Sequence, residues 1–324
     1  MVVAIDAIMT FFGSTANDAA FNAWITDIGH SSNRNRIQTL NSLCGFLAAV
    51  VAVGAAGFII DAFGYFIFFY VLGGVVTASG ILSIFIVKTP MISTDLPKPT
   101  IPFWSEFKQL INPTILRENR TLFLLFINMA ISGIATQVYL PYIYIFLENY
   151  LGLTKFQLGI YLALFLIITV VILLIFGFIS HKFNRRKLVL FGTVIGGILN
   201  ILVGALAPAL ITKPNLTVLL IVLYFIGTLP GLAAGVAHGG WLQDKYPGGE
   251  VGKFQGVRMI FMVLLPMVIG PPIGSAVIQS FGIPTADGFI PTPEIFLVGG
   301  IISLFAIIPI LFIPQEEGTI NFGD

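Results

Sequence analysis

The sequence has little charge and almost no cysteine. Only 10% of its 324 residues are charged, whereas 57% are apolar. A soluble domain carries about 25% charged residues, so the composition excludes an ordinary soluble protein and indicates a polytopic membrane protein. The single cysteine, Cys44, excludes a disulfide framework and a cysteine-based metal cluster.

Sequence signatures of common enzymes are missing as well. The chain contains no H-E-x-x-H, no G-x-S-x-G and no P-loop, so we expect neither enzyme activity nor a bound cofactor. The basic residues lie in short loops between apolar runs, which favours contact with the membrane surface and gives no support for nucleic-acid binding. We also expect no cleavable signal peptide, because no basic region precedes the first apolar run.

Long apolar runs dominate the chain. A membrane-spanning helix needs about 20 apolar residues, and about nine runs qualify. They lie at 2–25, 39–61, 64–88, 121–147, 157–180, 187–211, 216–240, 256–280 and 294–313. The sequence therefore predicts an all-α polytopic membrane protein.

The placement of basic residues predicts its orientation. If alternate loops, beginning with the loop after the first run, share one side, that side carries all but Lys155 and Lys213 of the 16 Lys and Arg residues. Loops rich in Lys and Arg face the cytoplasm. We therefore expect a multi-pass protein of the plasma membrane with a cytoplasmic C-terminus.

A weak repeat relates the beginning of the chain to its later part. Four pairs recur at one constant separation: Trp24 and Trp241, Asp27 and Asp244, Arg36 and Lys253, and Gly57 and Gly274. These pairs match the first two runs with the seventh and eighth, which gives a repeat unit of about six helices. We expect residues 1–88 to be the last three helices of an N-terminal unit, 89–120 a cytoplasmic linker with an interfacial helix, and 121–324 a six-helix C-terminal unit. A protein that simply has nine helices is the alternative.

The loop after the fifth run resembles a loop of a known transporter family. It reads Gly177-Phe-Ile-Ser-His181-Lys182-Phe-Asn184-Arg185-Arg186-Lys187. It is similar to the cytoplasmic G-x-L-x-D-R-x-G-R-R/K loop of the major facilitator superfamily. His181 and Asn184 stand where that loop usually has Asp and Gly.

A second stretch resembles the same superfamily. Gly57-Phe-Ile-Ile-Asp61-Ala-Phe-Gly64-Tyr65 is similar to the G-x-x-x-D-x-x-G-aromatic end of the family's fifth helix. The resemblance implies two parallel six-helix units and a secondary transporter that works by alternating access. It also implies that the family's first three helices are missing from this chain.

Residues 15–24, TANDAAFNAW, resemble the fourth helix of one subfamily. This subfamily is the glycoside–pentoside–hexuronide:cation symporters, to which the melibiose carrier belongs. The resemblance implies that Asp18 takes part in binding a cation and a sugar. Asn22 stands where that carrier has Trp, so the sugar-stacking part of its site is not reproduced at this position.

Asp18 also stands out on physical grounds. A charged residue at the centre of a membrane helix costs about 2.5–3.5 kcal/mol. If Asp27 marks the cytoplasmic surface, Asp18 lies about 13 Å deep. Its carboxylate must then face a watery cavity, bind a cation or pair with a base. We predict a site for H⁺ or Na⁺ made of Asp18, Asn17 and Asn22; a structural Asp bonded to neighbouring helices is the alternative.

The fourth run carries amides, hydroxyls and rings in an otherwise apolar stretch. Amides bind the hydroxyls of a sugar, and aromatic rings cover its C–H faces. We therefore predict a substrate site at Asn128, Gln137, Tyr139 and Tyr142. An aromatic belt at the external membrane surface explains Tyr142 equally well.

A third set of residues is predicted to form a cytoplasmic gate and its loops. Most are basic, and Asp27 and Asp244 lie beside them. The set is Asp27, Arg34, Arg36, His181, Lys182, Arg185, Arg186, Asp244, Lys253 and Arg258.

Three further features of the later runs are open to more than one interpretation. His238 is either a neutral side chain bonded across helices or a proton relay. The small residues Gly231, Gly235 and Gly239 form a ridge that would let another helix approach closely. The prolines at 271–272 predict a bend in the eighth run.

Together these features predict a secondary active transporter that couples H⁺ or Na⁺ to the symport of a sugar or a similar small polar solute. The expected partners are that solute and the lipid bilayer, and the full-length chain is expected to be a monomer. Two alternatives stay open, an efflux antiporter of apolar compounds and a non-transporting scaffold or receptor of the same fold.

Overall fold

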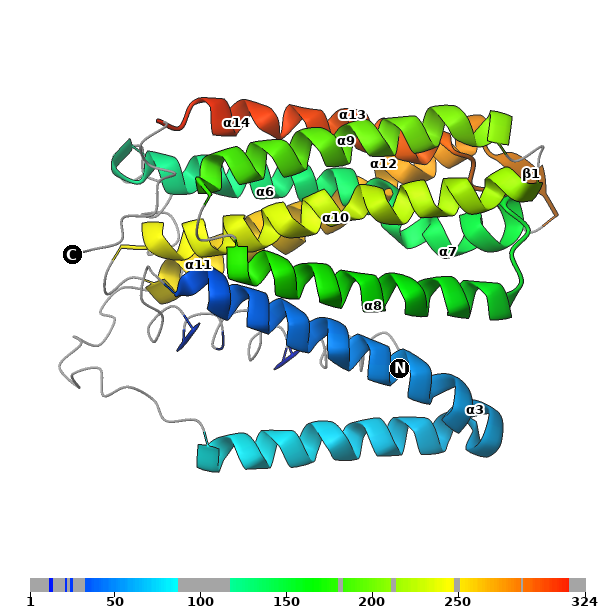
Figure 1. Ribbon diagram of the computed structural model, residues 1–324, viewed down its shortest axis with the longest axis horizontal. Coiled ribbons are helices and arrows are strands. Elements are labelled where there is room, and N and C mark those ends of the chain that lie inside the picture. Colours follow the sequence, from blue (N-terminus) through cyan, green and yellow to red (C-terminus); the bar gives the residue numbers. More distant parts are fainter. Residues whose placement is uncertain are drawn as a thin grey trace.

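Long helices that run roughly along one direction make up almost the whole chain (Figure 1). The computed structural model describes residues 12–13, 21, 24–25, 33–86, 117–179, 183–210, 214–247, 251–286 and 288–314. Within these ranges, seven helices are long and apolar enough to cross a membrane. The protein is therefore an all-α polytopic membrane protein, as predicted. The first expected run, 2–25, lies largely outside the described residues, so the count of about nine stays a prediction.

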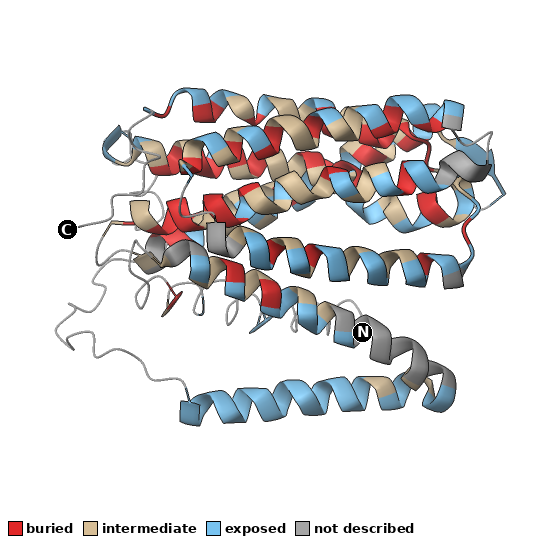
Figure 2. Ribbon diagram, viewed as in Figure 1, coloured by how far each residue is buried: buried red, intermediate tan, exposed pale blue. Residues whose placement is uncertain are grey.

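Helix α3 (Arg34–Ile86) contains the second and third predicted runs. It turns back at Gly64, whose φ of 81° and ψ of 171° are not helical. Glycine adopts a positive φ without steric cost, which explains why the chain turns here, at the predicted boundary between the two runs. The second limb, Ala62–Ile86, has no buried residue in its apolar window and stands apart from the other helices (Figure 2).

The remaining helices form a bundle that begins at residue 117. Its long helices lie close to the predicted runs, because uninterrupted apolar stretches of this length are stable as helices in a membrane. They are α6 (Arg120–Tyr139), α8 (Lys155–Ile179), α9 (Arg185–Leu210), α10 (Pro214–Lys245), α12 (Leu265–Phe281) and α13 (Glu294–Phe305).

Short elements extend these helices. The 3₁₀ turn η2 (Leu140–Tyr142), α7 (Ile143–Ile145) and the π-helical η3 (Phe146–Tyr150) continue α6. Before α12 come α11 (Val251–Met259) and the π-helical η5 (Ile260–Leu264), and after it the antiparallel pair β1 (Ile283–Thr285) and β2 (Gly288–Ile290). Helix α14 (Ile307–Leu311) follows α13.

The bundle has two distinct ends. Arg120 at the start of α6, Arg185 at the start of α9 and Lys245 at the end of α10 share one end, here called the basic end; the β1–β2 pair lies at the other (Figure 1). A buried cluster around Trp241, Phe126 and Phe254 fills the basic end, and a second cluster around Phe146 and Phe296 fills the opposite end.

Small residues set the spacing of α6 and α12. A methyl group at Gly274 would overlap the carbonyl oxygen of Val138, and one at Gly270 would overlap the side chain of Gln137. The two helix backbones therefore lie in direct contact, which is the close approach that glycine permits between membrane helices.

The structure bears on two expectations about helix shape. No described atom lies within 4 Å of a Cβ placed on Gly231 or Gly235, so within the described residues nothing packs against these two positions of the predicted ridge, whereas Gly239 is approached by Gln38 of α3. Helix α12 continues without interruption through Pro271 and Pro272, and a bend at these prolines stays a prediction. The irregular turn is the π-helical η5, which lies before the prolines.

Candidate functional site

A cavity of about 650 Å³ lies among α6, α8, α9 and α10. Binding sites for small solutes usually enclose about 300–1,000 Å³. The polar residues on its wall come mainly from α6, α9 and α10, and they are Asn128, Ser132, Thr136, Gln137, Tyr139, Tyr144, Thr193, Asn200, Tyr224, Thr228, His238 and Ser303. On the side of α3 and α8 the wall is apolar and consists of Phe46, Leu162 and Phe165. The cavity wall is therefore mostly apolar, with its polar groups gathered on one side, here called the polar side.

Three of the four residues predicted to bind substrate lie on the polar side. Asn128 is buried, and its Nδ2 donates a hydrogen bond to the carbonyl oxygen of Ala306 across 2.6 Å. Gln137 and Tyr139 follow on α6, and all three line the cavity. Their contact with a solute stays a prediction, but the structure brings them together in one place.

Tyr142 is not on the cavity wall. Its hydroxyl donates a hydrogen bond to the carbonyl oxygen of Pro271 across 2.8 Å. Its ring lies where a side chain on Gly274 would stand. The structure therefore gives Tyr142 a packing role between α12 and the turn that follows α6.

Tyr139 belongs to an aromatic and amide group that the sequence alone did not assemble. Its ring meets that of Tyr224 nearly at right angles, with centroids 6.3 Å apart, and that of Phe296 at 5.3 Å. The side chains of Thr136 and Asn200 lie near its hydroxyl, and both line the cavity. Rings and amides side by side are suited to the apolar faces and the hydroxyls of a sugar.

A periodic signal could have identified the α10 face of the cavity. Tyr224, Thr228, Gly231, Gly235 and His238 all line it. Their spacing alternates between four and three residues, which places them on one face of a helix. The sequence analysis interpreted two of these residues as a packing ridge and so missed a face that lines open space.

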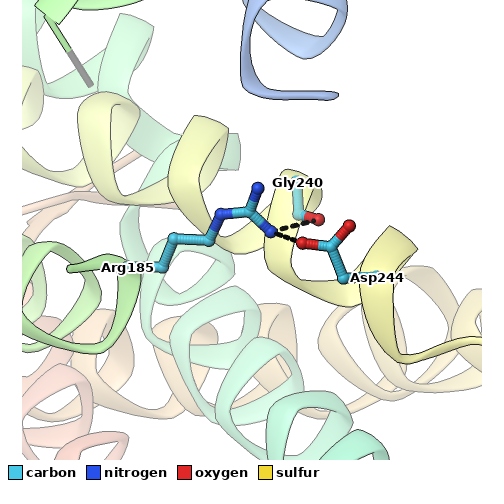
Figure 3. A network of polar contacts seen from close by, with 3 residues as sticks. All are labelled: Arg185, Gly240 and Asp244. Atoms are coloured by element: carbon cyan, nitrogen blue, oxygen red, sulfur yellow. Dashed lines mark hydrogen bonds and ion pairs between the residues drawn. The ribbon is translucent and has the colours of Figure 1, made fainter. Parts of the chain in front are cut away.

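Arg185 and Asp244 come together at the basic end. The Arg185 Nη1 forms an ion pair with Oδ2 of Asp244 and donates a hydrogen bond to the carbonyl oxygen of Gly240 across 2.9 Å (Figure 3). The Arg185 side chain is only 3% exposed and that of Asp244 23%. The predicted gate set thus contains a largely buried ion pair that joins the start of α9 to the end of α10.

Neighbouring residues of the same loop secure the helix ends. Arg186 donates hydrogen bonds to the carbonyl oxygens of Ile310 and Leu311, at 3.2 and 3.3 Å, at the end of α14. Asn184 accepts a hydrogen bond from the backbone N–H of Lys187 at 3.2 Å, which is the geometry of an N-cap. This cap is a physical reason for Asn where the family loop usually has Gly.

The structure describes few contacts of the other predicted gate and cation residues. Arg36 is exposed, and Arg258 donates a hydrogen bond to Oε1 of Gln255 across 2.9 Å. The remaining residues, or their side chains, lie outside the described part of the chain; they are Asn17, Asp18, Asn22, Asp27, Arg34, His181, Lys182 and Lys253.

Contacts between α3 and the bundle lie between the cavity and the basic end. Leu43 of α3, Leu173 of α8 and Val236 of α10 form a buried cluster. Nearer the basic end, Nε2 of Gln243 donates a hydrogen bond to Oε1 of Gln38 across 3.4 Å. We call these five residues the closure. The sequence analysis did not predict it, because the contacts join helices that are far apart in the chain.

A bundle of apolar helices around a mostly apolar cavity that carries a few polar groups fits the architecture of a membrane transporter. The sequence profile of the Major Facilitator Superfamily matches residues 1–141 and 125–322, which together cover almost the whole chain. The chain therefore belongs to the major facilitator superfamily and is a membrane transporter. A comparison with curated proteins gives no significant match.

Proposed function

We propose that the protein is a secondary active transporter that couples H⁺ or Na⁺ to the symport of a sugar or a similar small polar solute. The observation that carries this proposal is the polar side of the cavity. Asn128, Gln137 and Asn200 supply amides there, and Tyr139 and Tyr224 supply rings. A solute with both hydroxyls and apolar C–H faces would use both kinds of group.

The closure supports alternating access as the mechanism. It joins α3 to α8 and α10 between the cavity and the basic end. Rocking of the first unit against the second would separate these contacts and expose the cavity to the basic end, predicted to be cytoplasmic. The cluster is apolar and the glutamine pair is neutral, so the closure can open without separating charges.

The coupling ion is assigned to Asp18, with Asn17 and Asn22 beside it. This part of the proposal rests on the sequence, since these residues lie outside the described ranges. A carboxylate within a membrane helix is a functional candidate by default, because only a cation, a base or water makes its burial tolerable.

Reconstitution in liposomes tests the proposal. Radiolabelled melibiose, D-xylose and D-glucuronate represent the three solute classes of the subfamily that the sequence resembles. We expect saturable uptake of at least one, stimulated by an inward H⁺ or Na⁺ gradient. Asp18→Asn is expected to abolish the stimulation while the protein remains folded. Stimulated uptake that survives in Asp18→Asn would overturn the role of Asp18, and no flux under any gradient would favour a scaffold or receptor.

The apolar side of the cavity supports a second candidate, an efflux antiporter of apolar compounds. Phe46, Leu162 and Phe165 would receive an apolar solute without any polar contact. This function predicts that an apolar fluorescent cation, and none of the three sugars, moves against its gradient when a proton gradient is applied.

A further inference from the structure

His238 brings a buried ring nitrogen without a described hydrogen-bond partner to the cavity wall. The residue is 5% exposed and lines the cavity. Its Nε2 is buried and has no hydrogen-bond partner within the part of the chain that the structure describes. Most buried polar groups in proteins are hydrogen-bonded, and one that is not lowers the stability of the state that leaves it unpaired. A hydrogen-bond partner that reaches Nε2 during the transport cycle would remove this loss of stability.

The surroundings of His238 indicate where this partner would come from. Gly231 and Gly235 lie on the same face of α10, line the cavity, and have no described atom within 4 Å of the place where a Cβ would stand. The resulting passage leads along α10 from Tyr224 to His238, about 20 Å at 1.5 Å per residue. The cavity therefore extends along this face of α10 from Tyr224 to His238.

Its position also connects His238 to the closure. Val236 belongs to the buried cluster with Leu43 and Leu173, and Gly239 is in contact with Gln38. Both lie within one helical turn of His238. A solute that reaches the imidazole thus touches the segment of α10 that holds α3 in place.

We propose that His238 is a solute-binding residue at the end of the cavity nearest the closure, where Nε2 forms a hydrogen bond with a hydroxyl group of the transported solute. A hydroxyl group both donates and accepts, so it matches either neutral form of an imidazole. The inference rests on the proposed function and adds to it the residue that recognises the solute beside the closure.

Uptake kinetics in liposomes test the inference with three variants. His238→Leu removes both ring nitrogens, His238→Gln keeps a hydrogen-bonding group, and Thr169→Val is a matched control. Thr169 is fully buried, and its hydroxyl has no described hydrogen-bond partner, yet it does not line the cavity. We expect His238→Leu to raise the KM for the transported sugar about tenfold, His238→Gln to recover part of this loss, and Thr169→Val to leave the KM unchanged.

Deoxy sugars add a readout that a purely structural role would not change. Monodeoxy derivatives of the transported sugar are compared in the wild type and in His238→Gln, which keeps the test valid even where His238→Leu fails to fold. The one derivative that lacks the contacting hydroxyl is expected to lose affinity in the wild type and to lose much less in the variant, as residues in direct contact do in a double-mutant cycle.

The outcomes separate the two proposals. Saturable sugar uptake with an unchanged KM in His238→Leu would overturn the inference alone. The same conclusion would follow if every deoxy sugar lost affinity equally in the wild type and in His238→Gln. If none of melibiose, D-xylose and D-glucuronate is taken up by the wild type, the proposed symport of sugars fails and the inference fails with it.

Discussion

Gln243 of α10 donates a hydrogen bond to Gln38 of α3 across 3.4 Å, and thereby joins two helices from opposite parts of the chain. Beside them, a Cβ on Gly239 would stand 3.0 Å from Cδ of Gln38. Contact at this distance forces the neighbouring side chain to move. A side chain at residue 239 would therefore press on Gln38 of the closure.

Gly239→Val is therefore expected to weaken the closure and to shift the transporter toward the state that is open at the basic end. The measurement is alkylation of a cavity cysteine, Ser132→Cys in a Cys44→Ala background, by an impermeant maleimide added to either side of the membrane. Labelling should fall from the side opposite the basic end and rise from the basic end. Gly159→Val is the control, because no described atom lies within 4 Å of a Cβ at that exposed residue. Equal labelling in Gly239→Val and in the control would contradict the prediction.

The ion pair of Arg185 and Asp244 gives a prediction about stability. Asp244→Ala leaves a guanidinium that is almost fully buried without its carboxylate, and loss of one partner of a buried pair costs about 3–5 kcal/mol. Because Asp244 is partly exposed, we expect a value near the lower limit, about 3 kcal/mol. Unfolding in detergent, followed by circular dichroism, measures it.

The double variant Arg185→Met with Asp244→Leu distinguishes an unpaired charge from a loss of packing. A protein in which apolar residues of similar volume replace a buried ion pair is often as stable as the original, or more stable. The double variant should therefore be more stable than Asp244→Ala. If it is equally unstable or less stable, further contacts of Arg185 or Asp244 determine the stability of this end.

Close helix contacts lead to a third prediction. Gly274→Ala places a methyl group against the carbonyl oxygen of Val138, a backbone atom that cannot move aside alone. Overpacking of this kind costs about 1–3 kcal/mol. Gly231→Ala makes the same chemical change in open space on the cavity wall, so it should keep the stability and reduce uptake. Detergent unfolding and uptake, measured on both variants, test the contrast; equal stability of the two would refute it.

The long helices could be predicted from the sequence, whereas much of the cavity could not. Apolar length alone specifies a membrane helix, since every backbone group must be bonded within the segment. The turn at Gly64 was also visible, as a break between two runs. Spacing groups residues on one face of a helix, but it does not show whether that face packs on a neighbour or lines a cavity. For that reason Gly231 and Gly235 were assigned to packing, although they line open space.

The same limit applies to the predicted substrate site, because the sequence does not show which of its residues line the cavity. Asn128, Gln137 and Tyr139 were chosen because polar residues within an apolar run need a reason to be there, and all three line the cavity. Tyr142 satisfied the same criterion, yet its hydrogen bond is to Pro271, more than a hundred residues away in the chain. Tertiary contacts of this kind leave no mark in a single sequence.

Tyr139 and Tyr142 therefore allow a matched test, since Tyr→Phe removes one hydroxyl from each. Tyr142→Phe loses its hydrogen bond to the carbonyl oxygen of Pro271, a neutral bond worth about 1 kcal/mol, and should lower the stability while leaving the KM for the transported sugar unchanged. Tyr139→Phe removes a hydroxyl from the cavity wall and should raise that KM about fivefold. Uptake kinetics and detergent unfolding are measured on both proteins. A raised KM in Tyr142→Phe alone would contradict the assignment of the solute to this cavity and would place it near α12. The stability measurement supports this distinction, because a hydroxyl that contacts the solute can weaken binding without a comparable loss of stability.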